Sequence, residues 1–291
     1  MGVPLTRRCL FHVGNSDRFD RLVRGWAPVR ALAYARARRY VAGVALDDAL
    51  VVARRWLAQH LAASIDYLGW YVERPQAIDE VTAEYLRLCG ALRTLRADVH
   101  VSLDLTHLGL RSSVERCCAH VRRIAEALPP GARIQVGGES ARDAEGVLAA
   151  TLALAEAGVP VMATLQANLR RAARDADHLV DRGVAIRLCK GAYVESRRDA
   201  YPWGRETDAN YTALAHRLVE GEVPLALGTH DPALLASLLP AIPDAGIEVL
   251  LGVREAETRA LAAGRPVRVY VPYGENWFRY YLHRIAEARG A

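Results

Sequence analysis

Two positively charged side chains, Arg187 and Lys190, lie three residues apart at the end of a short apolar run of the sequence. They are followed by Gly191 and Ala192, small residues that allow a ligand to approach the backbone closely. Lys190 is the only lysine among 38 basic residues, and this exception to the general use of arginine indicates a function. The pair could form charge-assisted hydrogen bonds with an anionic or electron-rich ligand.

A second group of polar side chains lies near the C-terminus of the sequence. The segment Arg268–Trp277 contains several aromatic residues and is followed by Tyr280, His283 and Arg284. These three residues have the spacing of one helix face. Their polar tips favour a binding surface over an aromatic core helix.

Polar residues also follow most of the other apolar runs. They include Asp66, Asp104, Glu139, Gln166, Thr229 and His230. If these runs are parallel strands, their carboxyl ends meet at one edge and form a concave, charged mouth. Asp231 precedes Pro232, and we expect it to cap a helix.

Eight short apolar runs and the helical segments between them must position these side chains. The runs are Leu61–Leu68, Val99–Leu103, Arg133–Val136, Val159–Leu165, Val184–Leu188, Val223–Leu227, Ile247–Leu251 and Val267–Val271. Buried strands that alternate with amphipathic helices predict an α/β fold with a parallel sheet. Eight such units favour a closed (βα)8 barrel of the TIM type. The alternative is an open doubly wound sheet, but the glycine-rich turn that usually follows its first strand is missing.

The division of the chain follows from the same pattern. Residues 16–62 have few helix breakers and are predicted to be helical. We therefore expect an N-terminal helical arm over residues 1–60, packed on a catalytic barrel over residues 61–291. No length remains for a further domain.

Composition excludes several classes of protein. The chain has 291 residues, of which 52% are hydrophobic and 24% charged, as in globular proteins with a core. The five cysteines and nine histidines show neither a disulfide pattern nor the spacing of metal ligands, so no metal is expected. The net charge is +5, but the arginines are scattered, which argues against nucleic-acid binding. Without a membrane span or secretory signal, we expect a cytoplasmic bacterial protein.

Several short motifs, in order along the chain, resemble those of the proline dehydrogenase family. The family's R-L-V-K-G-A-Y corresponds to Arg187–Tyr193, with Cys189 in place of valine. Its final strand and helix, R-x-Y-V-P-Y-G-x-x-W-x-x-Y-x-x-R-R-I-A-E, match Arg268–Glu287. Shorter matches are Asp66–Gly69, Val101–Leu103, Leu165–Gln166 and Thr229–Asp231.

The resemblance implies a flavoenzyme that binds FAD at the mouth of the barrel. Members transfer a hydride from the carbon next to an amine nitrogen to the flavin, and oxidise L-proline to 1-pyrroline-5-carboxylate. The matching cofactor-binding residues are Gln166, Arg187, Lys190, Gly191, Ala192, Thr229 and His230. Arg187, Lys190 and Tyr193 are the expected catalytic residues, with the two cations offsetting charge on the reduced flavin. The expected substrate-binding residues are Trp70, Asp104, Leu250, Tyr280, His283 and Arg284.

Four positions depart from the family in charge. The family holds the substrate carboxylate with a lysine and two arginines, and here Asp104 replaces the lysine and His283 the first arginine. Trp70 replaces the acidic partner of that arginine, and Gly137 replaces an aspartate. We expect Asp104 to repel a bare carboxylate, although a protonated His283 would restore part of the positive charge at mildly acidic pH.

Three functions therefore stay open from the sequence. The first is a proline dehydrogenase. The second is a tailoring enzyme of specialised metabolism that oxidises a C–N or N–N bond in a modified proline, another secondary amine or a hydrazine. The third is a flavin-free barrel that only binds a ligand. The electron acceptor is a quinone or oxygen, and a quinone would bring peripheral contact with the inner face of the membrane.

Overall fold

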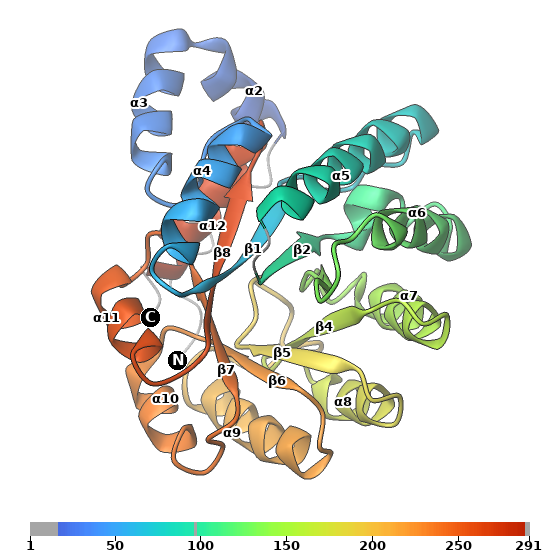
Figure 1. Ribbon diagram of the computed structural model, residues 1–291, viewed down its shortest axis with the longest axis vertical. Helices are drawn as coiled ribbons and strands as arrows, with labels where there is room; N and C mark the ends of the chain where they lie inside the picture. Colours follow the sequence, from blue (N-terminus) through green and yellow to red (C-terminus); the bar gives the residue numbers. More distant parts are fainter. Residues whose placement is uncertain (1–16, 96–97, 289–291) are drawn as a thin grey trace.

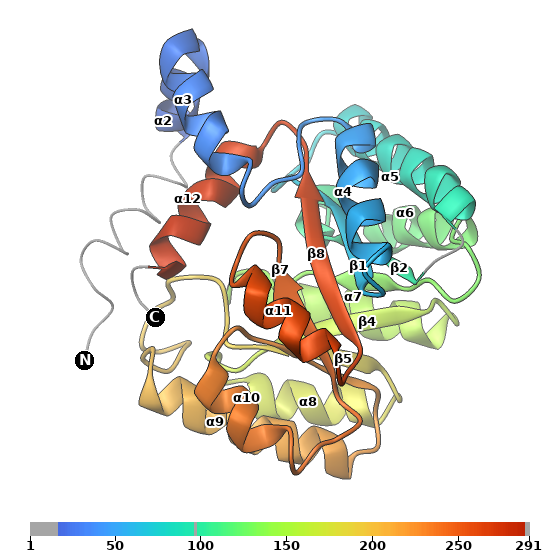
Figure 2. The same ribbon diagram turned by 60° about the vertical axis from the view of Figure 1, so that its left-hand side comes forward.

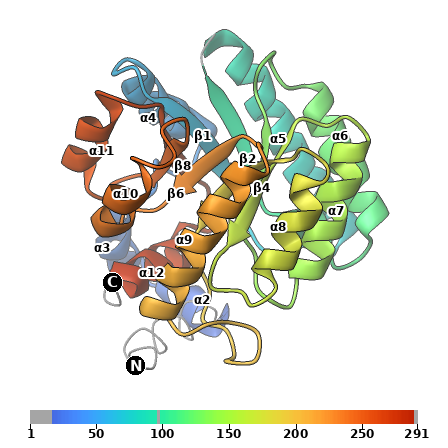
Figure 3. The ribbon, with the colours of Figure 1, turned by 90° about the horizontal axis from the view of Figure 1, so that it is seen from below.

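The computed structural model describes residues 17–95 and 98–288 of the chain. Eight parallel strands close into a barrel in the order of the sequence, with helices around them (Figure 1, Figure 3). The strands are β1 (Ala62–Tyr67), β2 (Val99–Leu103), β3 (Ile134–Val136), β4 (Val161–Gln166), β5 (Ala185–Cys189), β6 (Leu225–Gly228), β7 (Gly246–Leu250) and β8 (Val267–Tyr273). Each of the eight apolar runs contributes one strand, so the predicted (βα)8 barrel is confirmed.

The helices of the outer layer lie between the strands. They are α5 (Pro75–Leu95), α6 (Val114–Glu126), α7 (Ala144–Glu156), α8 (Ala172–Val180), α9 (Arg205–Glu220), α10 (Pro232–Leu238) and α11 (Glu255–Ala262). A short 3-10 helix, η1 (Leu105–Leu108), follows β2, and α12 (Trp277–Ala288) follows β8. Gly158 and Gly183 have positive φ just after α7 and α8, which is the backbone conformation that commonly ends a helix.

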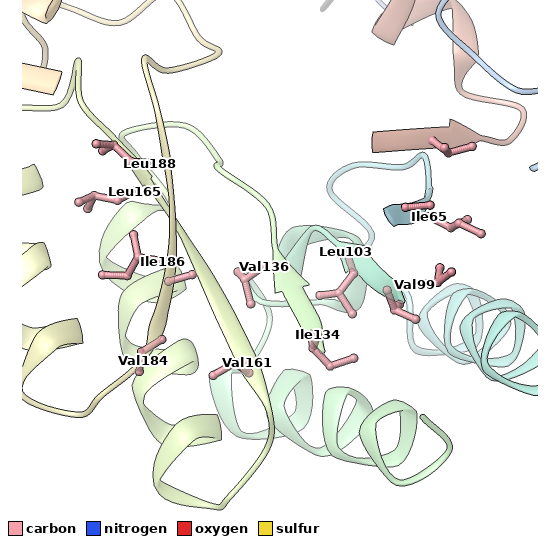
Figure 4. Close-up of a cluster of buried hydrophobic side chains, with 14 of the residues drawn as sticks. Ile65, Val99, Leu103, Ile134, Val136, Val161, Leu165, Val184, Ile186 and Leu188 are labelled. Atoms are coloured by element: carbon pink, nitrogen blue, oxygen red, sulfur yellow. The ribbon is translucent and has the colours of Figure 1, made fainter. Parts of the chain in front are cut away.

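The two sides of each strand differ in polarity. Apolar residues on one side pack under the helices, and Figure 4 shows Leu103, Ile134 and Ile186 among them. The alternate residues face the inside of the barrel and are largely polar. Across that interior, Gln135 of β3 donates a hydrogen bond of 2.6 Å to Glu248 of β7. The barrel therefore has an apolar outer core and a polar centre.

The N-terminal region, predicted to be helical over residues 16–62, is helical in the part that the structure describes. It forms three helices, α2 (Asp17–Gly25), α3 (Ala27–Ala37) and α4 (Leu46–Leu57). Pro28 sits in the first turn of α3, where the missing N–H is tolerated. Before α4, the Asp48 carboxylate accepts the backbone N–H groups of Val44 and Ala45, and a side chain at Gly43 would overlap it.

The three N-terminal helices lie in two places. Helix α4 packs against β1 and β8, in the outer layer where the barrel closes (Figure 2). Helices α2 and α3, which we call the arm, pack on α12 instead; the rings of Tyr34 and Trp277 lie 5.0 Å apart. How the chain divides into domains stays a prediction, but the arm supports the helix that carries Tyr280, His283 and Arg284.

The packing of α4 and of the arm predicts different losses of stability for substitutions of two tryptophans. Trp56 of α4 is 1% exposed, whereas Trp26, at the start of α3, is 64% exposed. Trp56→Ala should lower the free energy of unfolding by about 3–5 kcal/mol, because it leaves a cavity in the core. Trp26→Ala should change it by less than about 0.5 kcal/mol. Urea denaturation of both variants checks this, and equal costs would contradict the packing of α4.

Candidate active site

A cavity of about 780 Å³ opens at the carboxyl ends of the strands. The sequence-predicted site residues all line it, from Trp70 after β1 to Arg284 on α12. They are Trp70, Asp104, Gln166, Arg187, Lys190, Gly191, Ala192, Tyr193, Thr229, His230, Leu250, Tyr280, His283 and Arg284. The structure thus brings together residues that are up to 214 positions apart in the chain. Their individual roles stay predictions.

Arg187 lies at the floor of this cavity. Its Nε and Nη2 atoms donate to Thr164 Oγ1 at 3.1 and 2.8 Å, and Nη1 lies 3.4 Å from Glu248 Oε2. Thr164 is the register partner of Arg187 on β4, and Glu248 lies on β7. Neither partner was identified from the sequence, because each lies inside an apolar run. Arg187 is therefore a fixed, paired cation.

Lys190 lies between two carboxylates. Its Nζ atom is 2.6 Å from Asp208 Oδ1 on α9 and 2.7 Å from Asp231 Oδ2. Asp231 also caps α10 by accepting the N–H groups of Ala233 and Leu234, as predicted. The ammonium and the two carboxylates together carry a charge of minus one, so Lys190 is not a free cation. Asp208 had no sequence signal.

Gln166 fixes the loops at the rim. Its Oε1 accepts the N–H of Ala192 at 3.2 Å, and its Nε2 donates to the carbonyl of Glu139 at 2.6 Å. Gly191 has a φ of 124°, and a Cβ there would lie 2.0 Å from Asn168 Oδ1. Only glycine fits this turn, which holds the Gly191–Ala192 backbone at the cavity.

His230 and Leu250 are linked across neighbouring strands. The N–H of Leu250 donates to His230 Nε2 at 2.9 Å. Burial, with Arg284 and Arg254 nearby, lowers the pKa of His230 to about 4. The imidazole is therefore neutral at physiological pH, and its Nδ1 carries the hydrogen. Thr229 Oγ1 accepts the N–H of Asp231 at 3.1 Å, which orders the same loop.

Trp70, Tyr193 and His283 form an aromatic wall. The His283 ring lies 6.3 Å from Trp70 and 6.2 Å from Tyr193, edge to face in both cases. Burial raises the pKa of the Tyr193 hydroxyl well above its usual range. Two of the positions with altered charge, 70 and 283, are thus in contact. An aromatic pair stands where the resemblance to the family implies an acid and an arginine.

The expectation that His283 carries a positive charge at mildly acidic pH is wrong. His283 is 5% exposed. Burial, together with the charges of Arg284 and Arg279, lowers its pKa to about 3. The sequence could not show this, because spacing places His283 on the correct helix face but does not reveal how deeply it is buried.

Asp104 and Gly137, the other two altered positions, also lie against each other. A Cβ on residue 137 would come within 1.8 Å of Asp104 Oδ1, so the aspartate occupies space that only glycine leaves. Burial, followed by the charges of Glu139 and Asp66, raises the pKa of Asp104 well above its usual range. The four altered positions therefore form two contacting pairs.

Asp66, expected at the mouth of the barrel but given no role from the sequence, is a buried carboxyl group that lines the cavity. Tyr270 donates to it at 2.5 Å, Tyr85 at 3.2 Å and Ser102 at 3.5 Å. Burial raises the pKa of Asp66 to about 6, against the lowering effect of these hydrogen bonds. On the other side of Tyr270, the Tyr280 ring packs at 6.1 Å.

This geometry defines an α/β-barrel enzyme whose active site lies at the carboxyl ends of the strands. A model of the family described as proline dehydrogenase matches residues 49–289. The chain therefore belongs to the proline dehydrogenase family, as the sequence motifs indicated. It is an oxidoreductase of the type that acts on CH–NH groups.

Curated relatives and solved structures agree with this assignment. The chain is 32% identical over 261 residues to proline dehydrogenase 1 of Bacillus subtilis, with 86% of each protein covered. It is 29% identical over 265 residues to the proline dehydrogenase of Deinococcus radiodurans, again with 86% of each covered. The structure of proline utilization A from Bdellovibrio bacteriovorus shares the fold, with a TM-score of 0.81 and 20% identity. That match covers 97% of this chain and 36% of the larger protein.

The depressed pKa of His283 leads to a pH-dependent stability. In the unfolded chain a histidine titrates near pH 6.5, so protonation favours unfolding below that pH. The stabilisation is full above about pH 6.5 and falls by about 1.4 kcal/mol per pH unit towards pH 3. Between pH 6.5 and 5, wild type should lose about 2 kcal/mol relative to His283→Phe. Urea denaturation at both pH values measures this difference, and a constant difference would show that His283 titrates normally.

Proposed function

We propose that this protein binds FAD in the cavity and oxidises a small secondary amine at the carbon next to its nitrogen. The observation that carries the proposal is the convergence of Arg187, Gln166, the Gly191–Ala192 backbone and His230 on one cavity of about 780 Å³. Ligand pockets in proteins commonly measure 300–1,000 Å³, so the volume suits a large cofactor with a small substrate.

Two buried polar atoms support the presence of a ligand in this cavity. The Tyr280 hydroxyl and the Arg284 Nε have no hydrogen-bond partner among the described residues, and both residues line the cavity. Buried polar groups are normally paired, so such atoms are expected where a bound molecule completes the site. At the rim, Arg39 and Arg254 are cations suited to a diphosphate.

The residues present have distinct tasks in this proposal. FAD supplies the hydride acceptor when bound. Arg187, whose acidic partner among the described residues is Glu248, would hold the electron-rich edge of the cofactor. The Gly191–Ala192 backbone and His230 would contact its ribityl and phosphate portions. Tyr193 and Tyr280 would wall the substrate, and the aromatic wall would exclude water from the reacting carbon.

Two substrates are candidates. L-Proline, oxidised to 1-pyrroline-5-carboxylate, is supported by membership of the family and by the similarity to proline dehydrogenases. An amine other than free proline, acted on by a tailoring enzyme that oxidises a C–N or N–N bond, is favoured by one observation. The charged groups expected around a substrate carboxylate are replaced by Asp104 and by His283, which is uncharged near neutral pH.

FAD and Lys190 can be tested together. Wild type should purify with the absorption band of a bound flavin, which anaerobic addition of a secondary amine bleaches. Lys190→Ala should fold but lose FAD or slow the bleaching by about tenfold, because it leaves Asp208 and Asp231 facing each other at the cavity. Arg182→Ala, which removes an exposed cation on the outer layer, is the matched control.

Each outcome of this test is informative. A colourless protein that does not bind added FAD would favour the flavin-free barrel. Wild-type FAD content together with wild-type bleaching rates in Lys190→Ala would remove Lys190 from the site.

For the electron acceptor we propose a membrane quinone, reached by contact of the arm with anionic lipid; oxygen is the alternative. Leu22 and Trp26 of the arm are 67% and 64% exposed, and Leu32 is 60% exposed. Residues 17–43 contain seven arginines against two aspartates, a surplus as large as the net charge of the whole chain. Exposed apolar side chains among basic ones suit an anionic bilayer surface. None of the described helices has the length and apolarity needed to cross a bilayer.

Sedimentation with lipid vesicles tests whether the arm binds anionic lipid. Wild type should sediment with phosphatidylglycerol vesicles and not with phosphatidylcholine vesicles. Leu22→Ala with Trp26→Ala should weaken binding by at least about tenfold through lost apolar burial. Val51→Ala, an equally exposed apolar residue on α4, is the control. Equal binding to both kinds of vesicle, or equal binding by wild type and the double variant, would refute the contact of the arm with anionic lipid. If wild type is a dimer and the double variant is not, the exposed surface instead contacts a second copy of the chain.

A further inference from the structure

The carboxyl group of Asp104 stands out because its side chain has no hydrogen bond or ion pair with any described residue. It lies directly after β2 and lines the cavity. Its position depends on Gly137, since any larger residue there would displace it. An acidic group held in a protein cavity without a partner is unfavourable, and a ligand that donates to it relieves the cost.

The other charged groups in the inner part of the cavity are matched. Arg187 lies near Glu248, and Lys190 lies between Asp208 and Asp231. Arg284 forms a bidentate pair with Glu287, with contacts of 2.7 and 2.8 Å. Asp66, an acid without an ion pair, accepts three hydrogen bonds from hydroxyl groups. Among the described acidic residues of the inner cavity, Asp104 is the one whose partner a ligand would have to supply.

The surroundings of Asp104 indicate which kind of ligand this is. Tyr193, Trp70 and His283 form an uncharged aromatic wall of the same cavity, and aromatic faces attract cations. Tyr193 is close enough for the charge of Asp104 to affect its pKa. Tyr280, which is 6% exposed, lines the same cavity, and its hydroxyl has no hydrogen-bond partner among the described residues. A cavity lined by both a carboxyl group and aromatic rings suits an alkylammonium group.

We propose that the substrate carries a second, positively charged nitrogen that binds Asp104 against the aromatic wall, in the place where a proline-type substrate has its carboxylate. The substrate class is then a cyclic or linear diamine, oxidised at the secondary amine and held by the ammonium. This inference rests on the proposed function, because it assigns the substrate of the same site. The reaction stays a hydride transfer from carbon, with loss of one proton from the oxidised nitrogen.

Binding can be tested without turnover. Aminomethylcyclopentane and cyclopentanecarboxylate have no ring nitrogen, so neither can be oxidised there, and they differ in the charge that they present. Titration of the FAD-loaded protein, followed by the shift in the flavin spectrum, should show at least about tenfold tighter binding of the ammonium compound. Asp104→Asn should remove this preference. Equal or tighter binding of the carboxylate by wild type would overturn the inference.

Turnover separates this inference from the proposed function. Anaerobic flavin bleaching is measured with pyrrolidine, L-proline and (S)-2-(aminomethyl)pyrrolidine. We expect kcat/KM for the diamine to exceed that for proline at least tenfold, and Asp104→Asn to reduce this ratio at least tenfold. Bleaching by pyrrolidine without a preference for the diamine would overturn the role of Asp104 alone. No bleaching by any of the three amines would instead refute the oxidation of small secondary amines.

A reversal of the charge changes completes the test. The altered residues form two contacting pairs, so both members of each pair are changed together. The combined variant carries Trp70→Glu with His283→Arg, and Asp104→Lys with Gly137→Asp. The combined variant should gain at least tenfold in kcat/KM for L-proline and lose the diamine. If wild type already uses proline well and the variant gains nothing, the inference is wrong. Should the combined variant fail to fold, Asp104→Asn still decides.

Discussion

The organisation of the site depends on the cost of placing charge inside the barrel. The alternate residues of the strands face the buried centre of the barrel, and a buried charge there is tolerated only with a partner. Glu248 illustrates this constraint: it accepts a hydrogen bond from Gln135 across the barrel and lies near both Arg187 and Arg268. The same requirement makes Asp104 the informative residue of the cavity, because its carboxyl group has no hydrogen bond or ion pair with any described residue.

Helix α12, which lines one side of the cavity, is held in place by the arm outside the barrel. Helix α12 carries Tyr280, His283 and Arg284, and it is held by apolar contacts with the arm. Arg39, just after α3, donates to the carbonyl of Gly252 in the loop after β7, which ties the end of the arm to the mouth of the barrel. The arm is therefore a structural part of the site and also offers the exposed surface that we assign to lipid.

The strands and the residues that line the site could be predicted from the sequence. The contacts between those residues and their charge states could not, because they depend on tertiary packing. Strands and their polar ends are local patterns, so all eight strands were found, and the residues predicted for the site line one cavity. Thr164 and Glu248 were missed because their contacts with Arg187 depend on register and on closure of the barrel. The contact between positions 70 and 283 and the neutral state of His283 likewise depend on tertiary packing, which a single sequence does not show.

The most direct test of the account is whether Asp104 changes its ionisation when a cation binds. With the cavity empty, its raised pKa favours the protonated form, and a bound ammonium group favours the carboxylate. Calorimetric titration of the FAD-loaded protein with aminomethylcyclopentane, in two buffers of different ionisation enthalpy, counts the protons released. We predict the release of up to one more proton by wild type than by Asp104→Asn; the same proton count in both proteins would contradict the account.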